Sequence, residues 1–279
     1  MYYNYSVVVP YHDKYDLFLK AVESIPDRGD IQIIIVDNAP QPLEQEEVPV
    51  KQKSKVVYTT SSPTKGAGAA RNVGMKYVEG KFMLFLDADD YYTPEAFPAF
   101  DKYLDSDFDI VFFKPTSVRL CDGQISDRHL DLTRRVDAFC NKGDERAIRY
   151  RWGVPWSKII RSEFIKEGGF QFEEIKVNND AWFSLMTGHH AKKVFADPAI
   201  VYVVTEGGAG ESLMKTVTRE NAYIRYDAAI RENKFMKSVG RYDMHIRLLG
   251  YLRFALVNFG LKEMFRYLWI AKKNKVSIF

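Results

Sequence analysis

Short apolar runs without polar alternation constrain the fold of this 279-residue chain more than any other feature. Strands of this kind are buried on both faces, as in a parallel sheet that helices cover on each side. The expected strands comprise residues 6–10, 31–37, 55–60, 82–87 and 109–115. Helical spacing of apolar residues appears between them, for example from Leu17 to Ile25. The alternation predicts an α/β fold with a mostly parallel central sheet flanked by helices.

Composition narrows the class of protein. Hydrophobic residues make up 46% and charged residues 28% of the chain, which favours a folded protein with a sizeable core. The net charge of +3 is too small to indicate a nucleic-acid partner. There is no CxxC pair, no signal-peptide pattern and no window of about 18 uncharged apolar residues. We therefore expect a cytoplasmic protein without a membrane-spanning helix.

A shift in composition predicts two parts. Residues 1–214 contain the expected strands, and residues 215–279 form a helical C-terminal extension. Residues 241–279 hold eight basic residues against two acidic ones, a formal charge of +6, with aromatic residues interleaved. A basic, aromatic amphipathic helix can lie on an anionic membrane surface, here the inner face of the cell membrane. Packing on the first part of the chain, or formation of a homodimer, are the alternatives.

The stretch "KFMLFLDADD" ends an apolar strand in concentrated negative charge. Side chains at i and i+2 of an extended chain point the same way, so Asp87 and Asp89 are expected to converge beyond the sheet. A hard cation would relieve their repulsion, and Mg²⁺ or Mn²⁺ keeps positions open for phosphate oxygens. A solvated Asp-rich turn is the alternative interpretation.

Other strand ends carry complementary chemistry. Pro10 and Tyr11 could form a wall for a flat ring, and Asp37 and Asn38 could bind the edge of a base. Ordinary turn chemistry explains each of them equally well when taken alone.

The stretch "KGAGAARN" presents backbone amides at a helix N-terminus, where anions bind, and Arg71 as a fixed cation. Close packing of a helix with small residues on the sheet is the alternative for the glycines. Together with the three strand ends, this helix start predicts a ligand site at the carboxyl edge of the sheet.

Five segments resemble family 2 glycosyltransferases of the GT-A fold: "YSVVVPYHD", "IIIVDNAP", "KGAGAARNVGMKYVEGKFMLFLDADD", "VPWSKIIRSEFIKEGGFQFEE" and "NNDAWF". The resemblance covers roughly the first 210 residues, and the segment from GxxxARNxG to DxD is its most specific part. It implies a nucleotide-diphosphate-sugar donor, a divalent metal ion (Mn²⁺ or Mg²⁺) held through the DxD, and inversion at the anomeric carbon.

The same resemblance assigns roles to individual residues. It places the following residues in the donor site: Pro10, Tyr11 and Asp37 near the base, Arg71 near the base or diphosphate, Asp87 near the ribose or metal, and Asp89 at the metal. Asn38 stands where the family often has an acid that recognises the base. UDP is the most common donor nucleotide in the family, and the Asn38 departure leaves GDP and dTDP open.

The family also has an acidic base at the start of a helix, usually written Glu-Asp. Here the match is Asn179 and Asp180, so the base is kept and the preceding Glu is replaced. Asp180 would accept the proton of an acceptor hydroxyl as that hydroxyl attacks opposite the leaving group. Asp is also a good helix N-cap, which is the structural alternative.

Several further residues have both a functional and a structural interpretation. Trp156 and Asn179 are candidates for acceptor contact, although core packing is the more common role of Trp. His189 and His190 are adjacent on a helix and point about 100° apart, so we interpret them as structural. The glycine-rich stretch 205–212 is either a lid over the donor or a surface loop.

The expected function is transfer of a sugar from a nucleotide-diphosphate donor to a saccharide or lipid-linked saccharide in cell-surface polysaccharide synthesis. A non-catalytic nucleotide-sugar-binding module is one alternative. A Mg²⁺-dependent phosphotransferase is another, because such enzymes also place Asp-x-Asp at a strand end.

Overall fold

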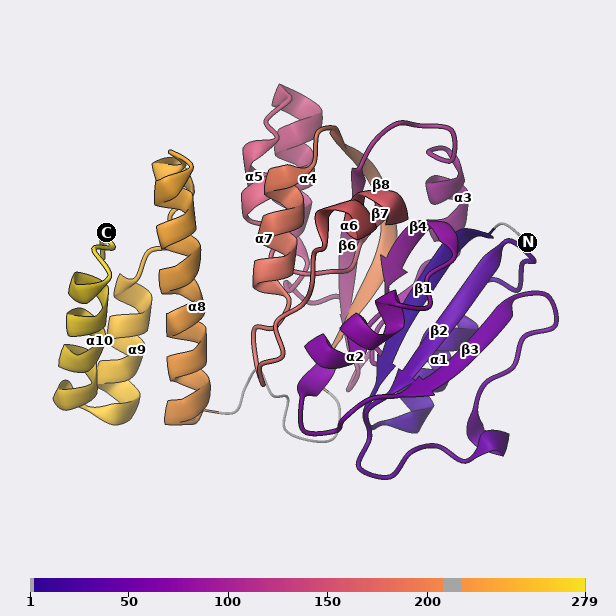
Figure 1. Ribbon diagram of the computed structural model, residues 1–279, viewed down its shortest axis with the longest axis horizontal. Helices are drawn as coiled ribbons and strands as arrows, with labels where there is room; N and C mark the ends of the chain where they lie inside the picture. Colours follow the sequence, from indigo (N-terminus) through magenta and orange to yellow (C-terminus); the bar gives the residue numbers. More distant parts are fainter. Residues whose placement is uncertain (1–2, 208–216, 279) are drawn as a thin grey trace.

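The computed structural model describes residues 3–207 and 217–278, and Figure 1 shows the arrangement of their helices and strands. The strands are β1 (Tyr3–Tyr11), β2 (Ile31–Asp37), β3 (Lys55–Thr60), β4 (Gly80–Phe85), β5 (Tyr91–Tyr92), β6 (Ile110–Arg119), β7 (Lys158–Arg161) and β8 (Val194–Glu206). The helices are α1 (Tyr15–Glu23), α2 (Gly66–Met75), α3 (Ala96–Asp101), α4 (Leu130–Lys142), α5 (Arg146–Tyr150), α6 (Ser162–Gly168), α7 (Ala181–His190), α8 (Arg219–Ser238), α9 (Leu249–Phe259) and α10 (Leu261–Lys273). Two short 3₁₀ turns, η1 (Gln45–Glu47) and η2 (Tyr242–Met244), complete the described elements.

In the described residues, eight strands form one sheet in the order β3-β2-β1-β4-β7-β6-β8-β5. The pairs β3–β2, β2–β1 and β1–β4 are parallel, as the apolar runs predicted. Strands β7 and β5 are antiparallel to their neighbours, whereas β6 and β8 run parallel to each other. The sheet is therefore mixed, and β3, β2, β1 and β4 form a parallel group at one of its edges.

The strand order fixes the position of a ligand site. The chain moves toward one edge through β1, α1 and β2, and toward the other through β3, α2 and β4. Because both crossovers are right-handed, α1 and α2 cover opposite faces of the sheet (Figure 1). The direction of winding changes between β1 and β4, and ligands bind at the carboxyl ends of strands at such a point.

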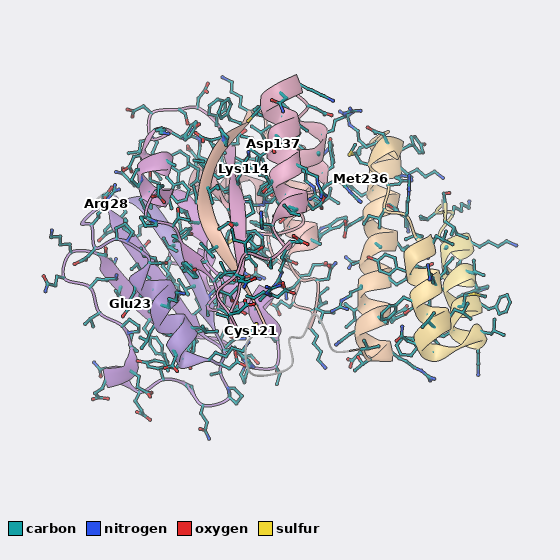
Figure 2. All side chains as sticks on the ribbon, turned by 180° about the vertical axis from the view of Figure 1, so that it is seen from behind. Glu23, Arg28, Lys114, Cys121, Asp137 and Met236 are labelled. Carbon is teal, nitrogen blue, oxygen red and sulfur yellow. The ribbon has the colours of Figure 1, made fainter. Side chains whose placement is uncertain are left out.

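The main core lies on both sides of the sheet and is rich in aromatic rings. The ring of Phe172 stacks on Phe183 of α7 with a centroid separation of 3.9 Å and meets the edge of Phe85, at the end of β4, at 5.0 Å. This contact holds the start of α7 against the end of β4. On another part of the sheet, the ion pair of Lys114 and Asp137 (2.6 Å; both labelled in Figure 2) joins β6 to α4.

The C-terminal helices form a separate layer. Helices α8, α9 and α10 lie side by side beyond α7, on the left of Figure 1. They enclose their own small core around the stacked rings of Tyr226 and Tyr267, which lie 4.2 Å apart. A third cluster, formed by Tyr150, Leu185 and Met236, joins α8 to the first part of the chain. The predicted boundary between residues 214 and 215 falls outside the described residues and stays a prediction.

The expected C-terminal amphipathic segment is divided by Gly260 into α9 and α10, which pack on each other. No helix among residues 3–207 and 217–278 has the length and apolar content needed to cross a membrane.

Candidate functional site

Three acids follow β4 in a tight turn. The amide of Asp90 donates to the carbonyl of Asp87 at 3.0 Å, which closes the turn. The i, i+2 rule of an extended chain does not apply to Asp87 and Asp89, because β4 ends at Phe85 and the chain turns after Asp87. The turn nevertheless keeps the two carboxylates close, since Asp87 raises the pKa of Asp89 in addition to the larger effect of burial.

Asp90 connects this turn to β8. Its buried carboxylate accepts hydrogen bonds from the hydroxyl of Tyr202 at 3.0 Å and from the amide of Thr205 at 2.7 Å. The Tyr202 hydroxyl also accepts a hydrogen bond from the amide of Asp87, at 3.1 Å, and the Thr205 hydroxyl donates to the carbonyl of Asp89, at 2.6 Å. Strand β8 therefore fixes the backbone from which Asp87 and Asp89 project.

The carboxylate of Asp89 is the free group of the turn. Within residues 3–207 and 217–278 it has no hydrogen bond or ion pair with another residue, and it is accessible to solvent. Desolvation is the main cause that raises the pKa of Asp89, and the charge of Asp87 raises it too. Lys14 and Arg128 act in the opposite direction. An anionic oxygen with nearby cations and no partner is suited to hold a ligand.

Arg71 joins the turn to the start of α7. Its guanidinium donates to the carboxylate of Asp87 at 2.5 Å and to the side-chain oxygen of Asn179 at 3.0 Å. It is buried against the ring of Phe172, 5.3 Å from the centroid. Burial disfavours the charged form, but Asp87 and Asp180 outweigh this effect and raise the pKa of Arg71. The structure thus brings together Arg71, Asp87 and Asn179.

Asp180 occupies the N-cap position of α7 without capping it. Its carbonyl accepts the amide of Ser184, but its side chain makes no capping hydrogen bond. Asn178 adopts a left-handed conformation (φ 61°), which Asn tolerates better than most residues and which turns the chain into the helix. Burial raises the pKa of Asp180, while Arg71 and Lys158 lower it and Asp87 raises it further. The capping alternative does not account for this side chain.

Lys158 is a buried cation behind Asp180. Its ammonium lies 3.4 Å from the hydroxyl of Ser184, one turn along α7, and 5.7 Å from the centroid of the Phe112 ring. Burial lowers the pKa of Lys158 to about 7, and Asp180 is the acid that opposes this shift. Ser157, just before it, has the uncommon φ of 55°. Lys158 is therefore poised between charge states at neutral pH.

The donor set at the turn fits a divalent cation only in part. Within the described ranges, no group of three or more His, Cys, Asp or Glu side chains is placed to hold a metal ion. Asp87 is also engaged by Arg71, so Asp89 is the better ligand. A cation there would take its remaining ligands from water and phosphate oxygens, as Mg²⁺ does in many nucleotide sites.

The predicted base-binding residues lie at the ends of β1 and β2. Asp37 is 1% exposed, and its carboxylate accepts from the amides of Ala39 and Leu43 and from the hydroxyl of Tyr58, each at 2.8 Å. Asn38 is also buried, and its carbonyl contacts the imidazole of His12.

The predicted wall for the base is part of the core. Pro10 belongs to β1 and pairs with Val36, and the ring of Tyr11 packs on Phe18 at 4.6 Å. A contact of Pro10, Tyr11, Asp37 or Asn38 with a nucleotide stays a prediction.

The predicted acceptor residues are occupied in different ways. The ring of Trp156 is 6% exposed and stacks on Tyr202, with centroids 4.8 Å apart and planes within 5°. This position makes Trp156 a core residue that supports Tyr202 and leaves little surface for an acceptor. Asn179 is oriented by Arg71.

Most of the remaining expectations concern structure. His189 bonds to Tyr150 and His190 to the carbonyl of Met186, in agreement with the structural interpretation. Most of the predicted lid, residues 208–212, lies outside the described residues. Close packing is supported for the small residues of α2, because a Cβ on Gly68 would overlap the carbonyl of Glu173 and one on Gly74 would overlap Val8 of β1. Anion binding by the amides of α2 stays a prediction.

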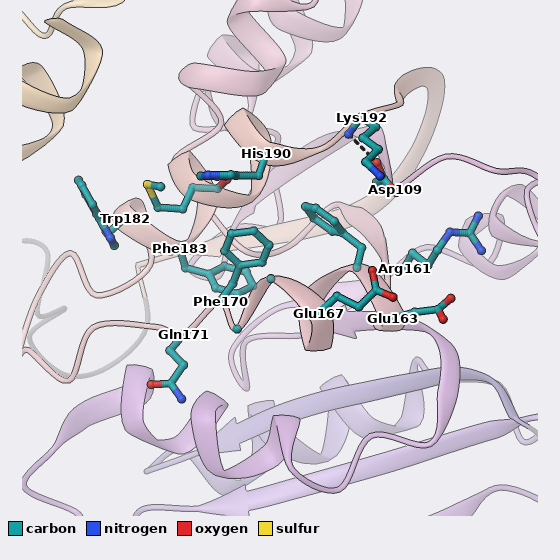
Figure 3. Close-up of a pocket in the computed structure, with 14 residues that line it drawn as sticks. Asp109, Arg161, Glu163, Glu167, Phe170, Gln171, Trp182, Phe183, His190 and Lys192 are labelled. Carbon is teal, nitrogen blue, oxygen red and sulfur yellow. Dashed lines mark hydrogen bonds between the residues drawn. The ribbon is translucent and has the colours of Figure 1, made fainter. Parts of the chain in front are cut away.

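A cavity of the described structure lies apart from this site. It has a volume of about 840 Å³ and lies between α6 and α7, where Phe170, Trp182 and His190 line it (Figure 3). Trp182, Met186 and His190 are four residues apart and occupy the face of α7 opposite Ser184. None of the predicted site residues lines this cavity.

Sequence reasoning missed three contributors to the site: Lys158, Asp90 and Tyr202. Lys158 stands at the head of the apolar stretch "KII", and a charge entering a buried strand was the available signal. No local pattern could reveal the bond between Tyr202 and Asp90, which are 112 positions apart.

Comparisons with known proteins identify the family of the chain. Residues 6–168, more than half of the chain, match the family described as Glycosyl transferase family 2. The chain is 29% identical over 174 residues to the "Minor teichoic acid biosynthesis protein GgaB" of Bacillus subtilis, covering 53% of this chain and 19% of that protein. It is 27% identical over 231 residues to the "Poly(ribitol-phosphate) beta-glucosyltransferase" of Bacillus spizizenii, covering 78% and 35%.

The crystal structure of S. aureus TarS 1–349 in complex with UDP-GlcNAc superposes with a TM-score of 0.70 at 19% identity, covering 97% of this chain and 80% of that one. This likeness confirms the expected GT-A fold. The chain spans only about a fifth to a third of the two curated relatives named above. From the matched family and the fold, we conclude that the chain belongs to glycosyl transferase family 2.

Proposed function

We propose that this chain is an inverting glycosyltransferase that transfers a sugar from a nucleotide-diphosphate donor, best a UDP-sugar, to a hydroxyl of a cell-surface polymer or its lipid-linked precursor. The bridge made by Arg71 carries the proposal, because one buried guanidinium connects the acidic turn after β4 to the start of α7. The acidic turn, with Asp87, and the start of α7, with the proposed base Asp180, therefore lie on two sides of the Arg71 guanidinium.

Each residue has a defined task in this reaction. Asp180 accepts the proton of the acceptor hydroxyl. The oxygen of that hydroxyl attacks the anomeric carbon, and the nucleoside diphosphate leaves from the opposite face. Arg71, held by Asp87, adds positive charge near the leaving group, and Lys14 and Arg128 act near Asp89. A divalent ion held by Asp89 with Asp87, when bound, supplies charge stabilisation for the diphosphate.

The names of the relatives support an acceptor class. The Bacillus spizizenii relative is named for poly(ribitol-phosphate), and the Bacillus subtilis relative for teichoic acid biosynthesis. We extend these names to the proposal that the acceptor is a polyol-phosphate polymer. The TarS complex with UDP-GlcNAc supports the proposed UDP-sugar donor, and the sugar itself stays open between glucose and N-acetylglucosamine.

The test is a thermal-shift screen of UDP, GDP and dTDP and their sugars, each with Mn²⁺, with Mg²⁺ and with EDTA. Binding to the folded state alone raises the melting temperature by mass action. We expect a metal-dependent rise with UDP and UDP-sugars. Equal responses to all three nucleotides, or none, would contradict the proposed donor, and turnover of a phosphate ester would favour a phosphotransferase.

The C-terminal helices carry the proposed peripheral contact with a membrane. Leu261, Phe265 and Trp269 follow one face of α10 and are 62%, 60% and 60% exposed. Lys262 and Arg266 form the adjacent stripe, so aromatic and basic groups suit an anionic bilayer surface.

Sedimentation with vesicles containing anionic lipid tests the membrane contact. Binding should fall in a Phe265→Glu, Trp269→Glu variant and persist in Val50→Glu, whose residue is 86% exposed and lies between η1 and β3, outside the C-terminal helices. Absence of binding by the unaltered chain would end the idea, and a dimer dissociated by the same substitutions would assign the face to self-association.

A further inference from the structure

Helix α8 runs parallel to α7 (Figure 1), and its contacts define the register between them. Phe235 packs on His189, near the end of α7, and on Trp182, near its start, with centroids 5.0 and 5.8 Å apart. One turn earlier on α8, Arg231 pairs with Glu173, which precedes α7, and lies over the ring of Trp182 at 5.8 Å. Moving toward the beginning of α8 therefore approaches Asp180.

Glu232 lies on the face of α8 that meets the first part of the chain. Phe235 and Met236, three and four residues further on, both pack there, and Ala228, four residues earlier, is buried. Residues at these spacings share one side of a helix. Glu232 therefore points toward the junction of α8 with α7 and lies level with the N-terminus of α7.

Ionisable groups from four other segments face this carboxylate. The pKa of Glu232 is raised to about 7, chiefly by burial, with Arg151 and Arg231 acting against the rise and Glu173 and Asp180 adding to it. On the side of α9, Tyr251 lies close enough for Glu232 and Arg151 to influence its pKa. Across residues 3–207 and 217–278, Glu232 has no hydrogen-bond or ion-pair partner.

Arg151 is the basic residue that the first part of the chain contributes near Glu232. It follows α5, and one of its guanidinium nitrogens lies 3.4 Å from the carbonyl of Met244, a long contact that leaves its other donors available within the described structure. An Arg fork suits phosphate oxygens, and a carboxylate suits the hydroxyls of a polyol. The junction thus presents both chemistries beside Asp180.

We propose that Glu232 and Arg151 form the acceptor subsite, in which Arg151 binds a phosphate and Glu232 a hydroxyl of a polyol-phosphate chain. The inference rests on the proposed function for the identity of the acceptor. It makes the C-terminal helices part of the active site, because α8 supplies a residue that meets the substrate.

The test is binding of ribitol 5-phosphate to the full chain, measured by calorimetry or ligand-observed NMR. Glu232→Gln and Arg151→Gln should each weaken binding at least tenfold, while the affinity for UDP with Mn²⁺ and the melting temperature are kept. Glu220→Gln is the matched control, since this acid is on the same helix and exposed, with only a loose ion pair to Lys176 at 3.8 Å. The control should bind as the unaltered chain does.

The outcomes separate this inference from the proposed function. No binding of ribitol 5-phosphate, or equal binding by all variants, overturns the acceptor subsite even if UDP-sugar is turned over. Binding that depends on Glu232 and Arg151 without any turnover of UDP-sugar would keep the subsite and refute the glycosyltransferase. Free ribitol, as a second probe, should bind more weakly than its phosphate and lose the dependence on Arg151.

Discussion

The acids at the end of β2 and those around the end of β4 differ in what surrounds them. The carboxylate of Asp37 accepts three hydrogen bonds from the protein itself. The carboxylates of Asp89 and Asp180 accept none from another residue of the described chain, although burial raises the pKa of both. An acid with all its hydrogen bonds made supports the fold, whereas an acid left unpartnered at a cost in free energy is available to a ligand.

The largest effect is expected from Asp180→Asn. An amide cannot accept the acceptor proton, so transfer should fall by about 10³-fold or more while UDP still binds. Single-turnover assays together with UDP calorimetry measure the two quantities. Retained turnover in this variant would remove Asp180 from the mechanism and weaken the comparison.

Asp89→Asn should come next. Loss of a charged metal ligand is expected to reduce transfer by about 100-fold and to abolish the effect of Mn²⁺ on UDP affinity. Thermal stability should be kept or slightly raised, because the repulsion with Asp87 disappears. A large drop in melting temperature would instead assign Asp89 to the fold.

Asp37→Asn should have the opposite signature. The Asn side chain offers one oxygen where the amides of Ala39 and Leu43 need two acceptors, so an N–H would face an N–H. We expect a loss of about 1–3 kcal/mol in the free energy of unfolding, measured by urea denaturation. If stability is unchanged while UDP affinity collapses, then Asp37 belongs to the binding site instead.

Lys158→Met should give the smallest kinetic change and the clearest pH dependence. The pKa of Lys158 is about 7 in the fold against 10.5 for a free side chain, so the unfolded chain binds more protons between these values. The free energy of unfolding of the unaltered chain should therefore rise with pH across that window, and the variant should lack this slope.

The same substitution removes a positive charge that lowers the pKa of Asp180. The acid limb of the pH–rate profile should therefore move to higher pH in Lys158→Met. A profile that does not move would show that Lys158 serves only packing.

The sequence was informative wherever a strand end or helix start carried its own signal. Asp87 follows a strand, Asp180 precedes a helix and Arg71 lies inside α2 after its glycines, and the family resemblance assigned a role to each. The structure connects Arg71 and Asp87 directly. The antiparallel strand β7 was missed because its four residues are too short for a periodic pattern. Trp156 shows the limit for single residues, since only the packing partner Tyr202 distinguishes a core ring from a surface for a sugar.

The junction with α8 could not be predicted at all. The position of Glu232 depends on the register between α7 and α8, which is set by the contacts of Arg231 and Phe235 with residues about 50 positions away. Helical periodicity identifies an apolar face but not the surface that it meets.

The central claim is that Asp89 and Asp180 act on the same donor molecule from two sides. A crystal structure of the chain with Mn²⁺ and a non-hydrolysable UDP-sugar tests this directly. The account predicts Mn²⁺ coordinated by Asp89 and the diphosphate, with the anomeric carbon between the ion and the Asp180 carboxylate. A donor bound away from Asp89, or an anomeric carbon turned away from Asp180, would contradict it.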